Sequence, residues 1–308
     1  MTDIEWTDRV WNPIVGCSRV SPGCEHCYAE RHAHRKLHES HRGLTVLRKH
    51  GPAWTGEVRF LPERLADPFK WRKACRVFVN SMSDVWHEQV TNEQIGALFG
   101  AMAATPHITY QVVTKRPERM RAWFKWAARA GRRGAPNDDP WWIVFECALL
   151  YSQLRLDAPI TPEAIRDRRW PLDNVGLLVT CEDQQRADER IPLLLDTPAA
   201  WRGVSYEPAL GPVHFNRPGA AWLSRDVSED RPAIDWLIIG GESGPQARPF
   251  DLAWARSAVA EARAAGVPVF MKQLGARPCD GEPRFITKHR KGGDPTEWPA
   301  ELRIREFP

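Results

Sequence analysis

Short apolar runs recur along the chain, and each is rich in β-branched or aromatic side chains. They are Val10–Val15, Arg76–Asn80, Thr109–Thr114, Val175–Thr180, Trp201–Ser205, Asp235–Gly240 and Val267–Met271. Runs this short and this apolar are typical of strands that are buried on both faces, as in a parallel sheet. The pattern therefore predicts that these strands share one buried sheet.

Helical periodicity fills several of the intervals between these runs. The predicted helices are Thr91–Ala104, Pro117–Ala130, Gln184–Leu195 and Leu252–Ala265. Strands and helices that alternate at about 30-residue spacing are typical of βα units. We therefore expect an α/β fold, in the form of a complete or partial (β/α) TIM-like barrel of parallel strands.

Polar and charged residues follow six of the predicted strands. They include Asn80, Ser81, Ser83, Asp84, Thr114, Lys115, Arg116, Cys181, Glu182, Asp183, Ser205, Tyr206, Glu207, Gly240, Gly241, Glu242, Lys272 and Gln273. The active site of a barrel lies at the C-terminal ends of its strands. We therefore expect these residues to form one site.

Three stretches break the alternation. Residues 28–75 are rich in His and Arg, and residues 131–172 form an insertion after the third strand, which we interpret as a lid or subdomain. Residues 277–308 have little periodicity and are expected to be a C-terminal extension on the surface. The prediction is a single barrel-like domain over residues 1–276.

Composition adds two constraints. The net charge of +4 permits nucleic-acid binding without arguing for it, because the usual footprint is a strongly basic stripe. The 15 Trp must be buried or stacked. Trp141 and Trp142, beside Arg132 and Arg133, are candidates for stacking bases, whereas burial in the core is the alternative. Trp6 and Trp11 flank the first strand and are expected to shield it.

Three cysteines lie close together in residues 16–30, directly after the first strand. Cys17, Cys24 and Cys27 have the spacing C-x6-C-x2-C. Three thiolates from one loop can hold three irons of a [4Fe–4S] cluster and leave the fourth open. A structural zinc held by the same thiols and His32, or unligated thiols, are the alternatives. The polar N-terminus and the lack of a long apolar run favour a cytoplasmic protein, and reduced thiols are typical there.

Several longer motifs resemble the phage-type three-Cys-motif proteins, a poorly characterised family that is similar to radical S-adenosylmethionine (SAM) enzymes. The resemblance rests on Ile4-Glu5-Trp6-Thr7-Asp8, Trp11-Asn12-Pro13, Gly16-Cys17, Pro22-Gly23-Cys24, Cys27-Tyr28-Ala29-Glu30, Thr114-Lys115-Arg116-Pro117-Glu118-Arg119, Glu207-Pro208, Gly211-Pro212 and Gly240-Gly241-Glu242-Ser243-Gly244. It implies a cluster held by the three cysteines, with SAM on the open iron and a deoxyadenosyl radical that takes hydrogen from a substrate. It also implies a bacterial or phage-infected cell and a protein partner encoded nearby.

The chain departs from the common radical SAM pattern at two places. Six residues separate the first two cysteines, where three are usual. The Gly-Gly-Glu that meets the SAM amino group usually follows the second strand, but Gly240-Gly241-Glu242 follows the sixth. In the second position stand Asn80, Ser81, Ser83 and Asp84, which are candidates for polar contacts with SAM.

The remaining strand-end residues have functional and structural interpretations. Lys115 and Arg116 suit a carboxylate or phosphate clamp, or an ion pair with Glu182, Glu207 or another strand-end acid. Glu182 and Glu207 suit acid–base or ribose contacts, and Lys272 suits a proton donor.

These observations favour a radical-SAM-like enzyme that modifies or repairs a substrate, with DNA or RNA as the expected partner. A zinc-stabilised nucleic-acid-binding barrel without redox chemistry, and a metal-free binding module, are the alternatives.

Overall fold

The structure is a computed structural model that describes residues 4–35, 38–49, 51–131, 140–152, 161–223, 232–281, 285 and 287–308. Its contacts divide the chain into two compact units. Unit 1 comprises residues 1–20, 27–177 and 197–200, and unit 2 comprises residues 21–26, 178–196 and 201–308. The strand β8 contributes residues to both units, and each unit is described separately below.

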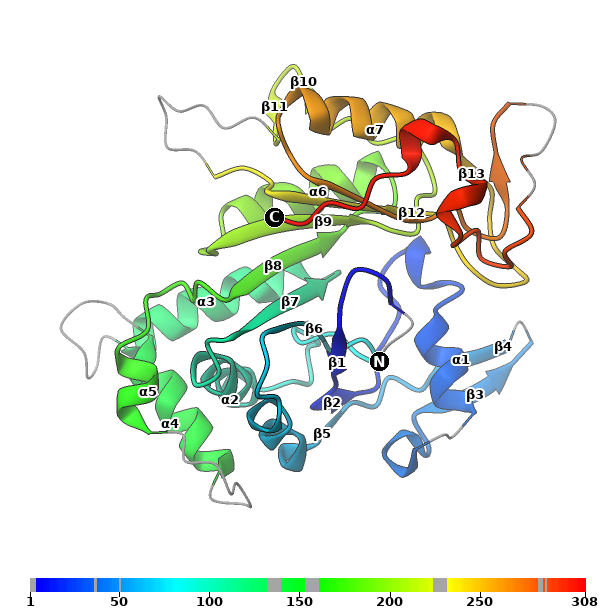
Figure 1. The fold of residues 1–308 in the computed structure, drawn as a ribbon. Helices are drawn as coiled ribbons and strands as arrows, with labels where there is room; N and C mark the ends of the chain where they lie inside the picture. The colour runs from blue at the N-terminus through cyan, green and yellow to red at the C-terminus, as the bar shows by residue number, and fades with distance from the viewer. Residues whose placement is uncertain are drawn as a thin grey trace. The chain divides into compact units, whose positions relative to one another are not determined.

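The main sheet contains all the strands that the apolar runs predict (Figure 1). Its hydrogen-bonded order is β1 (Arg9–Trp11), β6 (Cys75–Val79), β7 (Ile108–Thr114), β8 (Val175–Thr180), β9 (Trp201–Tyr206), β12 (Trp236–Gly240) and β14 (Val269–Gln273). The pairs β1–β6, β6–β7, β9–β12 and β12–β14 are parallel. The order follows the chain, and β1 and β14 stand at its two ends. It is therefore the order of a partial (β/α) barrel rather than of a closed one.

The first predicted strand, Val10–Val15, is two strands in the structure. β1 ends at Trp11, and β2 (Ile14–Val15) instead pairs antiparallel with β5 (Arg59–Phe60). Pro13 lies between them and has no N–H to donate to a ladder, which favours a break in the strand there. Trp6 and Trp11 are 3% and 0% exposed, which confirms that they pack in the core of unit 1.

Two helices of unit 1 follow the prediction closely. α2 (Asn92–Ala103) begins with a capping box, in which Thr91 and Gln94 each accept a backbone N–H from the other. α3 (Pro117–Gly131) starts at its proline. The large apolar side chains of α2, which are Ile95, Leu98, Phe99 and Met102, are all buried.

The described part of the 131–172 insertion is helical. α4 (Trp141–Ser152) packs against α2, and α5 (Pro162–Arg166) adds a short helix. The two long helices approach closely at Gly96 and Gly100, since a Cβ built on Gly96 would lie 2.8 Å from the Cβ of Cys147. These segments therefore add a second helical layer outside α2.

The segment between β2 and β6 forms a small substructure. Its described residues form α1 (Tyr28–His34), the antiparallel hairpin β3 (Thr45–Arg48) and β4 (Gly51–Trp54), and four 3₁₀ turns, of which three lie at Glu39–His41, Pro62–Ala66 and Pro68–Lys70. The fourth, Pro22–Cys24, belongs to unit 2. Val15, Ala29, Leu44 and Trp54 share an apolar cluster that joins α1 and the hairpin to the first strands.

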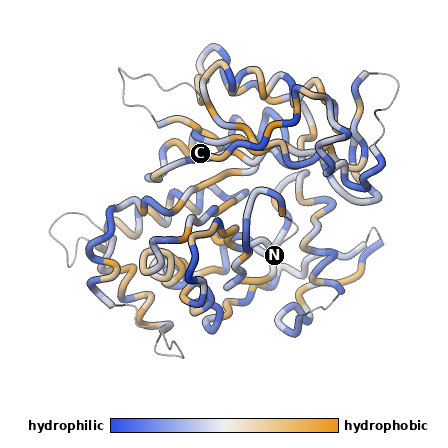
Figure 2. Tube along the Cα trace, viewed as in Figure 1, coloured by the Kyte–Doolittle hydropathy of each residue, from blue (hydrophilic) through white to orange (hydrophobic). Residues whose placement is uncertain are grey.

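Unit 2 carries the last strands of the sheet with α6 (Gln184–Leu195) and α7 (Leu252–Ala264), both within one residue of the prediction. Figure 2 shows the hydrophobic colour along β8 and β12, as expected for buried strands. Two short pairs complete the unit: β10 (Asn216–Arg217) with β11 (Ala220–Ala221), and β13 (Phe250–Asp251) with β15 (Pro278–Cys279). Among the described residues, no helix is long and apolar enough to cross a membrane.

Candidate functional site

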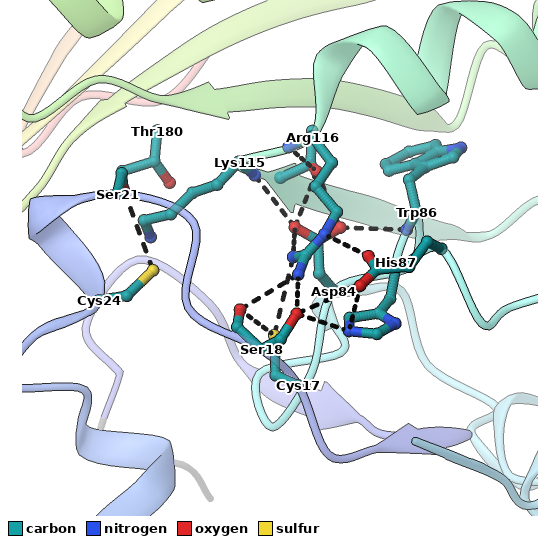
Figure 3. Close-up of polar contacts among 12 residues, drawn as sticks. Cys17, Ser18, Ser21, Cys24, Asp84, Trp86, His87, Lys115, Arg116 and Thr180 are labelled. Carbon is teal, nitrogen blue, oxygen red and sulfur yellow. Dashed lines mark hydrogen bonds and ion pairs between the residues drawn. The ribbon is translucent and has the colours of Figure 1, made fainter. Parts of the chain in front are cut away.

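Cys17 lies beside a buried arginine in unit 1. Gly16, at φ +90°, turns the chain after β2, where a Cβ would clash with the Glu57 carbonyl. Arg116, which follows β7, points its Nη1 at the Cys17 Sγ at 3.7 Å (Figure 3). Burial disfavours the charge of Arg116, but Asp84 and then Cys17 outweigh it, so its pKa is raised. The arginine therefore places a permanent positive charge at the first cysteine.

Asp84 organises this arginine from the loop after β6. Its carboxylate accepts from the Thr114 hydroxyl at 2.8 and 2.9 Å, from the Lys115 N–H at 3.1 Å and from Arg116 at 3.3 Å. Asp84 is 6% exposed. The ion pair expected for Arg116 thus forms with a strand-end acid, but the acid is Asp84 rather than Glu182 or Glu207.

A second group surrounds the other side of the arginine (Figure 3). Arg116 Nη2 donates to the carbonyl and the hydroxyl of Ser18, at 3.1 and 2.8 Å, and its Nε lies 3.3 Å from Glu88. His87 Nε2 lies 2.9 Å from the Ser18 hydroxyl. Burial, and then the charge of Arg116, lowers the pKa of His87. The residues after Cys17 are thus fixed by groups from two strand ends.

Asn80 ends β6 in an unusual state. It has φ +60°, is 2% exposed, and neither polar atom of its side chain has a hydrogen-bond partner in the described structure. A buried unpaired amide is costly and marks a site where a ligand or water completes the bonding. Its neighbours are engaged, since Ser81 donates to Asn12 and Ser83 donates to the Ile14 carbonyl. Asn80 is therefore the best placed of these residues to bind a ligand.

Cys24 belongs to unit 2, where Glu182 holds the segment before it. Glu182 is 0% exposed, accepts from Arg190 at 2.7 Å, and accepts from the Ser21 hydroxyl. A Cβ on Gly23 would overlap the Glu182 side chain, so only glycine fits there. These contacts hold the chain next to Cys24, and they enclose Glu182 in protein.

Glu242 holds the same segment through Arg248. Its carboxylate accepts from the Arg248 side chain at 2.6 and 3.0 Å, and Arg248 donates to the Pro22 carbonyl at 3.0 Å and to Glu25 at 3.1 Å. Gly241 is required because a Cβ would lie 2.5 Å from the Leu274 carbonyl oxygen. The Gly240-Gly241-Glu242 turn thus packs tightly, and Arg248 links Glu242 to the cysteine segment. Arg248 was not among the predicted site residues.

Glu207 and Lys272, at the ends of β9 and β14, form a separate ion pair. The Lys272 Nζ lies 2.5 Å from Glu207 Oε1, and the side chains of Lys272 and Glu207 are 15% and 17% exposed. A Cβ on Gly240 would be 3.4 Å from the Glu207 side chain. These two residues are more accessible than Glu182 and remain the candidates for acid–base work in unit 2.

The seven cysteines are all thiols, with none in a disulfide. Cys17, Cys24 and Cys27 are half-buried, and Cys147 and Cys181 are buried. Cys17 and Cys27 pack against one apolar cluster in unit 1, and the Ser21 hydroxyl lies 3.9 Å from Cys24 Sγ. In the described part of the chain, no three His, Cys, Asp or Glu side chains are grouped closely enough to hold a metal ion.

The donor chemistry of the three thiols nevertheless fits an iron–sulfur cluster. Each is half-buried, and the Arg116 guanidinium donates toward the Cys17 sulfur at 3.7 Å, so a positive charge lies beside the first of them. His32, the fourth ligand in the zinc alternative, is exposed and packs edge-on against Tyr28, with ring centroids 6.0 Å apart.

The expected base-stacking pair is only partly described. Trp142 is 36% exposed and meets Trp141 in a T-shaped contact with centroids 5.2 Å apart. Arg132 and Arg133 lie outside the described residues. The stacking role therefore stays a prediction.

A family model of proteins of unknown function, DUF5131, matches residues 1–294. The chain belongs to this family. No curated protein and no solved structure matches it. The DUF5131 match covers every strand of the main sheet and all the cysteines, so the site described above lies within the shared region.

Proposed function

We propose that this DUF5131 protein is a radical-SAM-like enzyme whose [4Fe–4S] cluster is held by Cys17, Cys24 and Cys27. The proposal rests on charged residues at the strand ends that contact the cysteine segment. In unit 1, Arg116 after β7 contacts the first cysteine. In unit 2, Glu182 after β8 and Glu242 after β12 hold the segment of the second. In each unit, charged side chains therefore hold the part of the cysteine segment that belongs to that unit.

The cluster would supply the electron that cleaves SAM bound at its open iron. The chain's own residues would do the rest. Arg116 donates toward the Cys17 sulfur and offsets its negative charge, which stabilises the ligating form of the thiol. Asp84 accepts from the guanidinium and is itself held by the Thr114 hydroxyl and the Lys115 N–H. The unpaired amide of Asn80 offers an NH₂ group as donor and an oxygen as acceptor to a bound ligand, and SAM is the ligand that the resemblance implies.

The substrate class we propose is nucleic acid, modified or repaired by hydrogen abstraction. Glu207 and Lys272 are half-buried and paired, so a proton could move between their carboxylate and amine once a substrate changes their surroundings. Glu182 is better described as an anchor, because its charge is satisfied by Arg190 and enclosed by protein.

The test is anaerobic metal analysis of the full chain. The wild type should hold about four irons and four sulfides per chain after reconstitution, and should cleave SAM when a strong reductant is added. The single variants Cys17→Ala, Cys24→Ala and Cys27→Ala should lose most of this iron and all SAM cleavage.

Cys75→Ala and Cys279→Ala are the matched controls, because both residues are half-buried thiols outside the cysteine segment. Both controls should keep the iron. A colourless protein that holds one zinc per chain would instead establish the zinc-stabilised barrel. A chain that holds no metal, and in which Cys24→Ala changes nothing, would establish a metal-free binding module.

A further inference from the structure

Residues 31–50 carry a local excess of positive charge. They contain six Lys or Arg and only one acidic residue, an excess of five, whereas the whole chain has a net charge of +4. Five of the ten His residues lie in the same segment. Concentrated positive charge is the electrostatic footprint that a polyanionic partner requires.

A β-hairpin presents part of this charge. β3 and β4 pair antiparallel from Thr45 opposite Trp54 to Arg48 opposite Gly51, and they lie beside α1 in Figure 1. At the base, Trp54 is 7% exposed, and its N–H donates to the buried Glu30 of α1 at 3.1 Å. The base is thus fixed to the core of unit 1, and Arg48 stands at the opposite end.

The tip of the hairpin is exposed and combines two kinds of side chain. Leu47 is 72% exposed, the highest value for a large apolar side chain among the described residues, and Val46 is 42% exposed. Arg48 and Lys49 are exposed, and neither forms an ion pair with a described residue. A lone exposed leucine is common. A leucine beside two unpaired cations on a braced ribbon is a combination suited to a charged partner with apolar faces.

The cations nearer the base of the hairpin are partly neutralised or used in structure. Arg42 pairs with Glu39 at 3.2 Å, and Arg59 donates to the carbonyls of Arg42 and Ser40. Burial, and then the charges of His38 and His32, lowers the pKa of His41, as expected in positive surroundings. The tip therefore carries the positive charge that is most available for binding.

We propose that the tip of the β3–β4 hairpin, formed by Leu47, Arg48 and Lys49, is a nucleic-acid-binding surface. The two cations contact backbone phosphates, and Leu47 packs against sugar or base surface, as apolar side chains do when they enter a groove. A two-stranded ribbon has the width that the major groove of a duplex admits. The inference rests on the proposed function, because this surface binds the nucleic acid that we propose as substrate. The binding itself does not require the cluster.

The experiment measures binding of the full chain to labelled single-stranded DNA, duplex DNA and RNA by fluorescence anisotropy at several salt concentrations. Arg48→Glu with Lys49→Glu should weaken binding by about tenfold or more, and should lower the slope of log affinity against log salt by about two. Leu47→Ser should weaken binding without changing the slope. The relative affinities for the three probes identify the preferred form of nucleic acid.

Lys125→Glu with Arg129→Glu is the matched control, because both side chains are exposed cations four residues apart on α3. This control should bind as the wild type does. Equal losses in the two charge-reversed variants, or wild-type binding to phosphatidylserine vesicles but to none of the nucleic acids, would overturn the inference. A variant with all three of Cys17, Cys24 and Cys27 changed to Ala should still bind, so failure of the cluster and failure of the hairpin are distinguishable.

Discussion

Three carboxylates at the strand ends have structural roles that their contacts define. Asp84, Glu182 and Glu242 are each at most 6% exposed, and each accepts from an arginine. A buried ion pair is costly to break, because the remaining charge has no solvent to replace its partner. Such pairs position other groups well, and their burial keeps them away from a substrate. The acid–base candidates therefore narrow to Glu207 and Lys272.

The first prediction concerns His87, whose side chain is fully buried. One ring nitrogen lies 2.9 Å from the Ser18 hydroxyl, and the other accepts from the Gln89 N–H at 3.3 Å, so the ring fits as the neutral form. Its pKa in the folded chain is lowered, whereas in the unfolded chain it is about 6.5. As the pH falls below about 6.5, protons bind the unfolded chain first, so the free energy of unfolding should decrease.

Urea unfolding between about pH 7 and pH 5 measures this dependence. His87→Gln should make the curve flatter, since the group that titrates is removed. His107→Gln, at an exposed histidine, is the control and should keep the wild-type slope. An unchanged slope in His87→Gln would show that other groups cause the dependence.

At the scale of elements, sequence periodicity was a reliable guide where an element is amphipathic or wholly buried. α2, α6 and α7 begin and end within one residue of their predicted bounds, because caps such as Thr91 and Asp183 are local signals. The partners of the strand-end acids were not predictable. Arg190 on α6 contacts Glu182, and Arg248 in the loop after β12 contacts Glu242. Both contacts form because the chain folds back on itself, and the spacing of the residues in the sequence does not predict this.

The second prediction concerns the contact between α2 and α4. A Cβ on Gly100 would overlap the Cβ of Ala148, so Gly100→Ala should force the helices apart and lower the free energy of unfolding by about 1–3 kcal/mol. Ala148→Gly removes the opposing methyl and costs about 1 kcal/mol by itself through helix propensity. The double variant should then be more stable than the sum of the two single changes implies. Strict additivity in urea unfolding would mean that the helices do not meet at these residues.

At the scale of the whole molecule, the three-cysteine segment is divided between the two compact units. Cys17 and Cys27 belong to unit 1, and Cys24 belongs to unit 2. The family match ends at residue 294, but the chain after it is integrated into unit 2, since Met271 and Glu306 donate to the Ile304 and Val269 carbonyls at 2.8 and 2.9 Å.

The last prediction concerns this tail. Trp298 is 2% exposed, donates to the Gly292 carbonyl at 2.9 Å, and packs under the Arg305 guanidinium, which lies 5.4 Å from its ring centroid. Trp298→Ala should lower the free energy of unfolding by about 3–5 kcal/mol. Phe307→Ala, at a side chain that is 36% exposed, should cost less than half as much. A chain that ends at Asp294 should leave the outer edge of β14 without its backbone partners and make unit 2 sensitive to proteolysis. If the shortened chain resists protease as the full chain does, the tail only covers the surface, as its weak periodicity first suggested.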